Sequence, residues 1–212
     1  MGGRNSNATP AQSPVVTCYA TQNCMLIKIE RQEVIDKFPN LPLRFYNSEE
    51  DEYVFKYPKV FANYVLTLLS KSYKGKIKLL GSQLVFLLNN LGYDNLIFLG
   101  DEDTAWLWRL KVHENFQEGL QYLVDNKINK RFNGALQVDT AEIPTFIKHL
   151  ALLVRTNGIL PYVHFVDFGQ NIIGSICQHG NLHISTKNKM ADKNFKNAIA
   201  KSQFIFLGDE NC

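Results

Sequence analysis

Residues 162–186 read YVHFVDFGQNIIGSICQHGNLHIST, and this stretch decides the fold because it predicts a three-stranded antiparallel meander. Short runs of β-branched and aromatic residues alternate in it with turn-forming residues. A two-residue turn at 169–170 would place Phe165 opposite Gly174. For the second turn we expect a three-residue loop at 179–181. This loop keeps the apolar residues on one face, whereas a shift by one residue would exchange the faces.

The polar face of this meander contains the candidate catalytic residues. The expected pairing of Ile176 with Ile184 fixes which side chains share that face. They are Tyr162, His164, Ser175, Cys177, His183 and Ser185. Cys177 next to His183 or His164 is a pair that can form a thiolate nucleophile, because an imidazolium lowers the pKa of a thiol. Since the sequence offers neither an orienting group nor an oxyanion hole, a solvent-facing polar surface is the competing interpretation.

The hexapeptide IFLGDE occurs twice, at 97–102 and at 205–210. Each copy is an apolar run, typical of a strand, that leads into a glycine and two carboxylates. The identity suggests a weak internal duplication into two halves, although the remainder of the two halves does not align well. If the two turns met, their carboxylates would supply oxygen ligands for a hard cation, although solvated turns are the simpler interpretation. The candidate ligands are Asp101, Glu102, Asp209 and Glu210.

Cysteine is used too sparsely to build a disulfide scaffold. Cys18 and Cys24 are six residues apart, a spacing that matches neither a zinc site nor a redox pair. The string Cys177, His179 and His183 contains metal-ligand types, but it lacks further ligands. We therefore expect free thiols in a reducing cytoplasm and no cofactor.

The remaining chain predicts an α+β fold with about four to five helices and a mixed or mainly antiparallel sheet. Apolar residues at helical spacing predict helices at 32–38, 58–75, 82–91, 116–124, 140–156 and, weakly, 192–201. Alternating or continuous apolar runs predict strands at 15–19, 25–29, 43–46, 53–57, 96–99, 104–111, 136–138 and 204–207. Two hairpins with acidic tips would join 43–46 to 53–57 and 96–99 to 104–111. We expect one domain over 15–212, after a disordered leader at 1–14.

Length and composition exclude several classes of protein. The chain has 212 residues, of which 45% are hydrophobic and 12% aromatic, too many for an intrinsically disordered protein. No apolar run approaches the roughly 18 residues of a membrane-spanning helix. The formal net charge of +3 is too small to indicate nucleic acid or an acidic membrane as partner. Residues 1–6 fit an N-terminal lipidation pattern, but so short a match is more often accidental, and the leader lacks the apolar core of a signal peptide.

A small soluble binding or interaction protein is the leading functional expectation, because charged turns and scattered sites outnumber any complete catalytic set. Its partner would be an unidentified protein or small molecule, its location the cytoplasm, and its state a monomer or homodimer. The second hypothesis is a hydrolase or transferase that uses Cys177 with His183 or His164. The third is a nucleic-acid-associated protein that uses two lysine runs, within 71–78 and 187–201.

Overall fold

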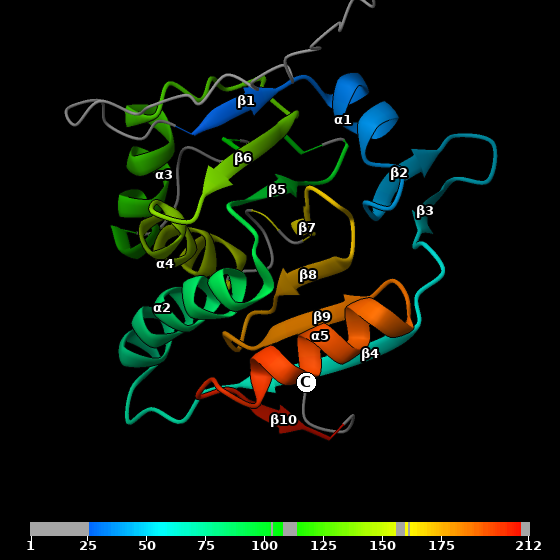
Figure 1. Cartoon of the computed structure of the whole chain (residues 1–212). Coiled ribbons are helices and arrows are strands. Elements are labelled where there is room, and N and C mark those ends of the chain that lie inside the picture. The colour runs from blue at the N-terminus through cyan, green and yellow to red at the C-terminus, as the bar shows by residue number, and fades with distance from the viewer. Residues whose placement is uncertain (1–25, 103, 108–113, 156–159, 161, 209–212) are drawn as a thin grey trace, which may run out of the picture.

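A single antiparallel sheet organises the computed structural model of the chain, which describes residues 26–102, 104–107, 114–155, 160 and 162–208. Within these residues the sheet has eight strands in the order β1-β6-β5-β7-β8-β9-β4-β10, and every neighbouring pair is antiparallel (Figure 1). The strands are β1 (Ile27–Ile29), β4 (Ala62–Thr67), β5 (Asn95–Leu99), β6 (Ala135–Asp139), β7 (His164–Asp167), β8 (Ile172–Ile176), β9 (Leu182–Thr186) and β10 (Ile205–Leu207). A separate hairpin pairs β2 (Leu43–Asn47) with β3 (Glu52–Lys56).

Helices cover the two faces of the sheet unequally. They are α1 (Arg31–Lys37), α2 (Tyr73–Leu91), α3 (Glu114–Asp125), α4 (Ile143–Val154) and α5 (Lys189–Ile199). The helices α2, α3, α4 and α5 pack on one face, where they share the larger apolar core with the strands. On the other face α1 and the chain leading into β2 cover only part of the sheet, over a smaller core. The expected α+β class, with a mainly antiparallel sheet and four to five helices, is confirmed.

The strand β5 shows why the sequence folds into two layers around the sheet. Leu96 and Phe98 belong to the core under the helices, whereas Ile97 and Leu99 belong to the core under α1. Because successive side chains of a strand point to opposite faces, a strand covered on both faces must be apolar throughout. The continuous apolar run at 96–99 is therefore an interior strand, as expected from the sequence.

The meander forms with the expected first turn and a shifted second turn. Phe165 pairs with Gly174, as expected. The second loop has three residues, but it lies at 178–180 instead of 179–181, so that Ile176 pairs with Leu182 and the expected pairing with Ile184 is wrong. The reason is Gly180, whose φ of 69° suits the last position of such a loop, where a side chain would be strained. The shift is two residues in register, which keeps every side chain on its expected face.

The largest error concerns the expected helix at 58–75. Residues 62–67 form the strand β4 between β9 and β10, and the long helix α2 begins after Ser72, which caps it by accepting a hydrogen bond from the backbone N–H of Gly75. The expected start of a helix at Ser82 is wrong as well, although its expected end at Gly92 is confirmed, with a left-handed φ of 74°. Apolar residues at 60, 61, 64, 65, 68 and 69 fit a helical spacing, but tertiary pairing with β9 decided the conformation.

The expected hairpin between 96–99 and 104–111 is wrong where the structure describes it. Both neighbours of β5 are other strands, β6 and β7, and residues 104–107 form no strand. Trp106 is instead a buried side chain of the main core, and its indole N–H donates a hydrogen bond to the carbonyl oxygen of Gly134, 2.8 Å away. Residues 108–111, the expected leader at 1–14 and the expected strand at 15–19 lie outside the described residues.

The two IFLGDE copies occupy unlike positions. The first forms β5, which is paired on both sides, whereas the second begins with β10 at an edge of the sheet. Five antiparallel pairings lead from β5 to β10, so these strands point in opposite directions and their carboxyl ends leave the sheet at opposite sides. Internal duplication stays a prediction that the strand order does not support. In the part of the chain that is described, no helix is both long and apolar enough to cross a lipid bilayer.

Candidate functional site

A row of three polar side chains crosses the middle of the meander. Ser175 on β8 lies directly opposite His164 on β7 and directly opposite His183 on β9. Directly opposed residues of an antiparallel pair have Cβ atoms about 5 Å apart, so Ser175 lies between two imidazole rings. In the next row along the strands, Val166 and Ile173 pack in the core beneath α1. The polar row therefore begins where the cover provided by α1 ends.

Two adjoining cavities open over this row, and together we call them the imidazole cleft. A cavity of about 350 Å³ is lined by Phe55, Tyr162 and Cys177, among others, and a neighbouring one of about 260 Å³ by Tyr57 and Asn63, among others. Both cavities share the row itself, namely His164, Ser175 and His183. Cavities of a few hundred cubic ångströms are large enough to hold a small molecule.

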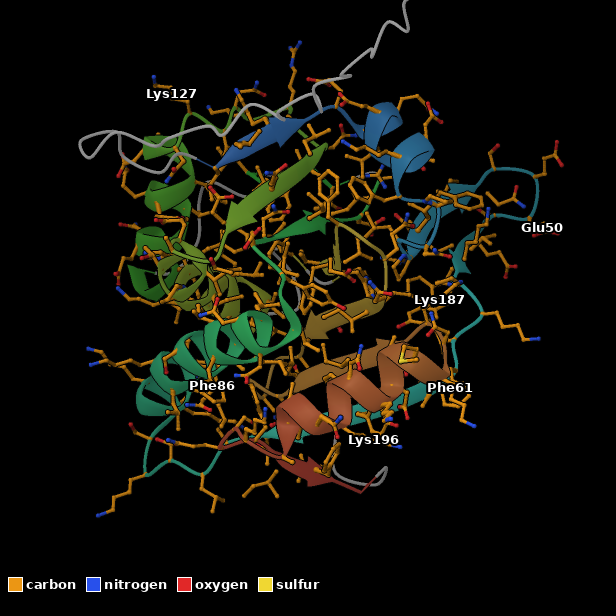
Figure 2. The ribbon with its side chains drawn as sticks, in the orientation of Figure 1. Glu50, Phe61, Phe86, Lys127, Lys187 and Lys196 are labelled. Carbon is orange, nitrogen blue, oxygen red and sulfur yellow. The ribbon has the colours of Figure 1, made fainter. Side chains whose placement is uncertain are left out.

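Three aromatic residues form the aromatic wall of the imidazole cleft: Phe55 on the β2–β3 hairpin, Tyr57 just after it, and Tyr162 just before β7. The ring centroid of Phe55 lies 5.6 Å from that of His164 and 6.4 Å from that of Tyr162. The ring of Tyr57 lies 6.1 Å from His164. Phe55, Tyr57 and Tyr162 remain between 41% and 46% exposed, so that part of each ring is open to a ligand. The acidic tip of the same hairpin, at Glu50, points away from the sheet and contributes nothing to the cleft (Figure 2).

A short hydrogen-bond chain orders the polar end of the cleft. The hydroxyl of Ser185 donates to the side-chain oxygen of Asn63 at 2.6 Å. Its oxygen also lies 2.9 Å from the hydroxyl oxygen of Tyr57. Because Ser185 has one hydroxyl proton and gives it to Asn63, Tyr57 must be the donor in the second bond. The chain thus holds the Tyr57 ring against the sheet.

Both histidines of the row are uncharged at neutral pH. Burial, together with the smaller effect of the neighbouring His183, lowers the pKa of His164 to about 4. Burial also lowers the pKa of His183 below its ordinary value. Among the described residues that line the two cavities, none carries a carboxylate, ammonium or guanidinium group. The cleft is therefore polar but electrically neutral.

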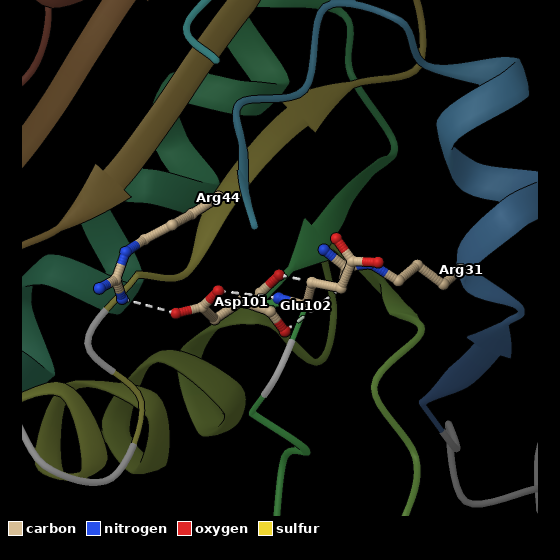
Figure 3. A network of polar contacts seen from close by, with 5 residues as sticks. Arg31, Arg44, Asp101 and Glu102 are labelled. Atoms are coloured by element: carbon tan, nitrogen blue, oxygen red, sulfur yellow. Dashed lines mark hydrogen bonds and ion pairs between the residues drawn. The ribbon is translucent and has the colours of Figure 1, made fainter. Parts of the chain in front are cut away.

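The hairpin is held over the cleft by Arg44. Its guanidinium forms an ion pair with Asp101 at 2.7 Å, and lies 3.8 Å from the ring centroid of Tyr53 and 4.0 Å from that of Tyr162. Asp101 lies at the end of β5 and is 5% exposed. On the other side of Asp101, Arg31 donates to the carbonyl oxygens of the same turn, at 3.2 Å and 3.3 Å (Figure 3). The contacts of Arg44 with Asp101 and Tyr162 attach the hairpin to the centre of the sheet.

The structure brings some of the sequence candidates together and separates others. His164 and His183 flank Ser175, and Cys177 lines the larger cavity with them. Owing to the shifted register, Cys177 lies beyond this row, across from Asn181, to whose carbonyl oxygen its backbone N–H donates at 3.1 Å. At neutral pH an uncharged His183 cannot stabilise a thiolate as an imidazolium would. Phe55 and Tyr57 of the aromatic wall, and Arg44, were not singled out from the sequence, although the aromatic residues at 53, 55 and 57 alternate along the expected strand at 53–57.

The expected metal ligands do not form a described centre. The carboxylate of Asp101 binds Arg44 and accepts a hydrogen bond from the backbone N–H of Glu102. Asp209 and Glu210 lie outside the described residues, so this cation site stays a prediction. Across the described ranges, no group of three or more His, Cys, Asp or Glu side chains could hold a metal ion. Cys177, His179 and His183 thus do not form such a group.

The two lysine runs are partly occupied by contacts within the protein. Lys76 donates to the side chain of Asn181 at 2.6 Å, Lys187 donates to the side chain of Asn40 at 2.6 Å, and Lys196 forms an ion pair with Asp192 at 3.0 Å. Figure 2 shows Lys187 and Lys196 in separate places on the molecule. Of these three bonds, only the ion pair of Lys196 offsets a charge that a nucleic-acid surface would need for phosphates, because Lys76 and Lys187 bond to uncharged amide oxygens.

The imidazole cleft can offer hydrogen bonds and flat apolar surface, but no charge. An uncharged imidazole provides one donor and one acceptor, and a serine hydroxyl provides both in any direction. The rings of Phe55 and Tyr162 offer stacking surfaces beside them. Comparison of the chain with protein-family models, with curated proteins and with solved structures gave no match.

Proposed function

We propose that the protein is a non-catalytic binding protein, and that its imidazole cleft takes a small neutral molecule with a flat, hydrogen-bonding ring. The observation that carries this proposal is the neutrality of a cleft that combines aromatic faces with His164, Ser175 and His183. A charged ligand entering it would lose its hydration without gaining an opposite charge. A neutral ring would stack on the aromatic wall and exchange hydrogen bonds with the row.

The sharpest test varies the charge of a ligand while keeping its ring. Nicotinamide is neutral, nicotinate is an anion, and 1-methylnicotinamide, which is methylated on the ring nitrogen, is a cation. All three contain the same six-membered ring. We expect nicotinamide to bind more tightly than either charged analogue, with amide chemical-shift changes in an NMR titration centred on Ser175 and His183. Equal binding of the three, or shift changes confined to another surface, would overturn the proposal.

Two variants locate the interaction within the cleft. Replacing Phe55 by Leu removes a stacking surface and should weaken nicotinamide binding by about threefold to tenfold, since an aromatic pair contributes about 0.5–1.5 kcal/mol. Ser175→Val should weaken it as well, because the imidazoles lose the hydroxyl between them. Tyr46→Leu is the matched control, because Tyr46 lies on the same hairpin, is exposed, and lines neither cavity. The Tyr46→Leu variant should bind nicotinamide as tightly as the native protein does.

A second candidate function is supported by the position of Cys177. This thiol shares the larger cavity with Ser175 and His183, and an uncharged imidazole can accept a proton from a hydroxyl or a thiol. A hydrolase or transferase would use Cys177 or Ser175 as the nucleophile and His183 or His164 as the base. We rank it second because, among the described residues lining the cavity, no carboxylate is present to orient either imidazole.

Labelling with iodoacetamide distinguishes the two functions. In a binding protein, the labelling rate of Cys177 should rise with pH around the ordinary thiol pKa of about 8.5. Mass spectrometry of peptides separates Cys177 from Cys18, Cys24 and Cys212, which serve as references in the same sample. If Cys177 were labelled rapidly at a pH well below about 8.5, while the three reference cysteines were not, the enzyme would be favoured over the binding protein.

A further inference from the structure

A separate cavity of about 630 Å³ is lined by residues of α2, α3 and α4, and we call it the helical cleft. Figure 1 shows these three helices close together on one side of the sheet. Its apolar lining comes from Ile77 on α2, Phe116 on α3 and Leu152 on α4. Ile77 is buried beneath it, and the other two are half-buried. The helical cleft shares no lining residue with the imidazole cleft.

The rim of the helical cleft is cationic. Lys74, Lys148 and Arg155 line it together with a single described carboxylate, that of Glu118, which gives the described lining a net charge of +2 (three cations minus one anion). Lys148 forms an ion pair with Glu118. This pair uses the one carboxylate, so the charges of Lys74 and Arg155 remain in excess over acidic groups in the lining.

The position of Arg155 matters because of the helix ends that meet at this cleft. Tyr73 belongs to the first turn of α2, and its hydroxyl donates to the carbonyl oxygen of Ala151 in the last turn of α4, at 3.2 Å. The amino end of a helix favours an anion and the carboxyl end disfavours one. Arg155 stands at the carboxyl end of α4, with its guanidinium 4.2 Å from the ring centroid of Tyr73. The positive charge of Arg155 therefore offsets the partial negative charge at the carboxyl end of α4, which would otherwise disfavour an anion.

We infer that the helical cleft binds an amphipathic anion, a molecule with an apolar body and one carboxylate or similar head group. The body would lie on Ile77, Phe116 and Leu152, and the head group would lie between Lys74 and Arg155. Charge complementarity decides the class of ligand, because a purely apolar occupant would leave two cations without an opposite charge. The site is independent of the proposed function of the imidazole cleft.

Decanoate and decan-1-ol test this inference with the full-length protein, because they share a chain length and differ in the charge of the head group. Calorimetric titration below the micelle concentration should show decanoate binding with one site per chain, at least about tenfold more tightly than the alcohol. Added salt should weaken decanoate binding and leave that of the alcohol unchanged. Equal affinity of the two compounds, or no binding of decanoate, would overturn the inference.

Matched variants place the anion. Lys74→Gln with Arg155→Gln should lower the decanoate affinity by about tenfold, since two partly exposed ion pairs are lost. Lys74→Gln alone, at an exposed side chain, should give part of that loss without a change in the circular dichroism spectrum. The double variant Lys71→Gln with Lys78→Gln removes the same charge outside the lining and should bind as the native protein does.

Glu118→Gln should strengthen decanoate binding, because it removes the opposing carboxylate and frees Lys148. Ser175→Val, in the imidazole cleft, should leave decanoate binding unchanged. If Ser175→Val abolished decanoate binding, or if the Lys71 and Lys78 control lost as much affinity as the cleft variant, the assignment to the helical cleft would be wrong.

Discussion

The lowered pKa of His164 makes the stability of the fold depend on pH. Its imidazole lies beside the aromatic rings of Phe55 and Tyr57 and opposite Ser175. This environment favours the uncharged imidazole over the charged one. Its pKa of about 4 in the folded protein lies below the ordinary value of 6.5. The unfolded chain therefore binds a proton at pH values where the folded protein does not. The stability that His164 contributes is fully present above about pH 6.5 and is lost as the pH falls towards 4.

We predict that His164→Gln flattens this pH dependence. Between about pH 6.5 and pH 4, the free energy of unfolding of the native protein should fall by about 2–3 kcal/mol more than that of the variant. Urea unfolding at a series of pH values measures the difference. His179→Gln, which replaces an exposed histidine on the neighbouring loop, should retain the native pH dependence. Parallel pH profiles for the native protein and His164→Gln would show that His164 is readily protonated in the fold.

The β2–β3 hairpin is the element on which the imidazole cleft depends. In the described structure neither strand of the hairpin pairs with a strand of the main sheet. The hairpin is therefore held in place by a few contacts of its side chains and of one backbone group. Arg44 provides several of these: the ion pair with Asp101, the stacking on Tyr162, and a carbonyl oxygen that accepts from the backbone N–H of Glu102 at 3.4 Å. Loss of this one side chain should therefore loosen the whole hairpin.

Arg44→Met is predicted to lower the free energy of unfolding by about 1–3 kcal/mol, because it leaves the buried Asp101 carboxylate without its partner. Hydrogen exchange at the β2 and β3 amides should become faster, while exchange in β5 and β7 changes little. The control is Lys56→Met, which removes an exposed charge on the same hairpin. Asp101→Asn added to Arg44→Met should recover part of the stability. Unchanged exchange in Arg44→Met would mean that other contacts hold the hairpin.

At the scale of the whole molecule, the sequence predicts what depends on neighbouring residues and fails where distant segments meet. The row of His164, Ser175 and His183 could be predicted to share a face, because only turn lengths and alternation decide it. The aromatic wall could not be assigned to that row, because nothing in a single sequence links 53–57 to 164 and 183. The strand β4 was expected as part of a helix for the same reason, since its spacing fits both periods and its neighbours lie far along the chain.

The order of the strands in the sheet has a consequence for how the protein is made. The strand β4 at 62–67 pairs with β9 at 182–186 and with β10 at 205–207. A ribosome delivers the chain from its amino end, so β4 leaves the exit tunnel long before either partner strand has been synthesised. During that interval its backbone amides and carbonyls have no strand to bond to, and they offer an edge to other nascent chains. Contacts this distant in sequence also slow folding after release. The half of the sheet that includes β9, β4 and β10, and with it the cavity beside Asn63, closes only after residues 182–207 have been synthesised.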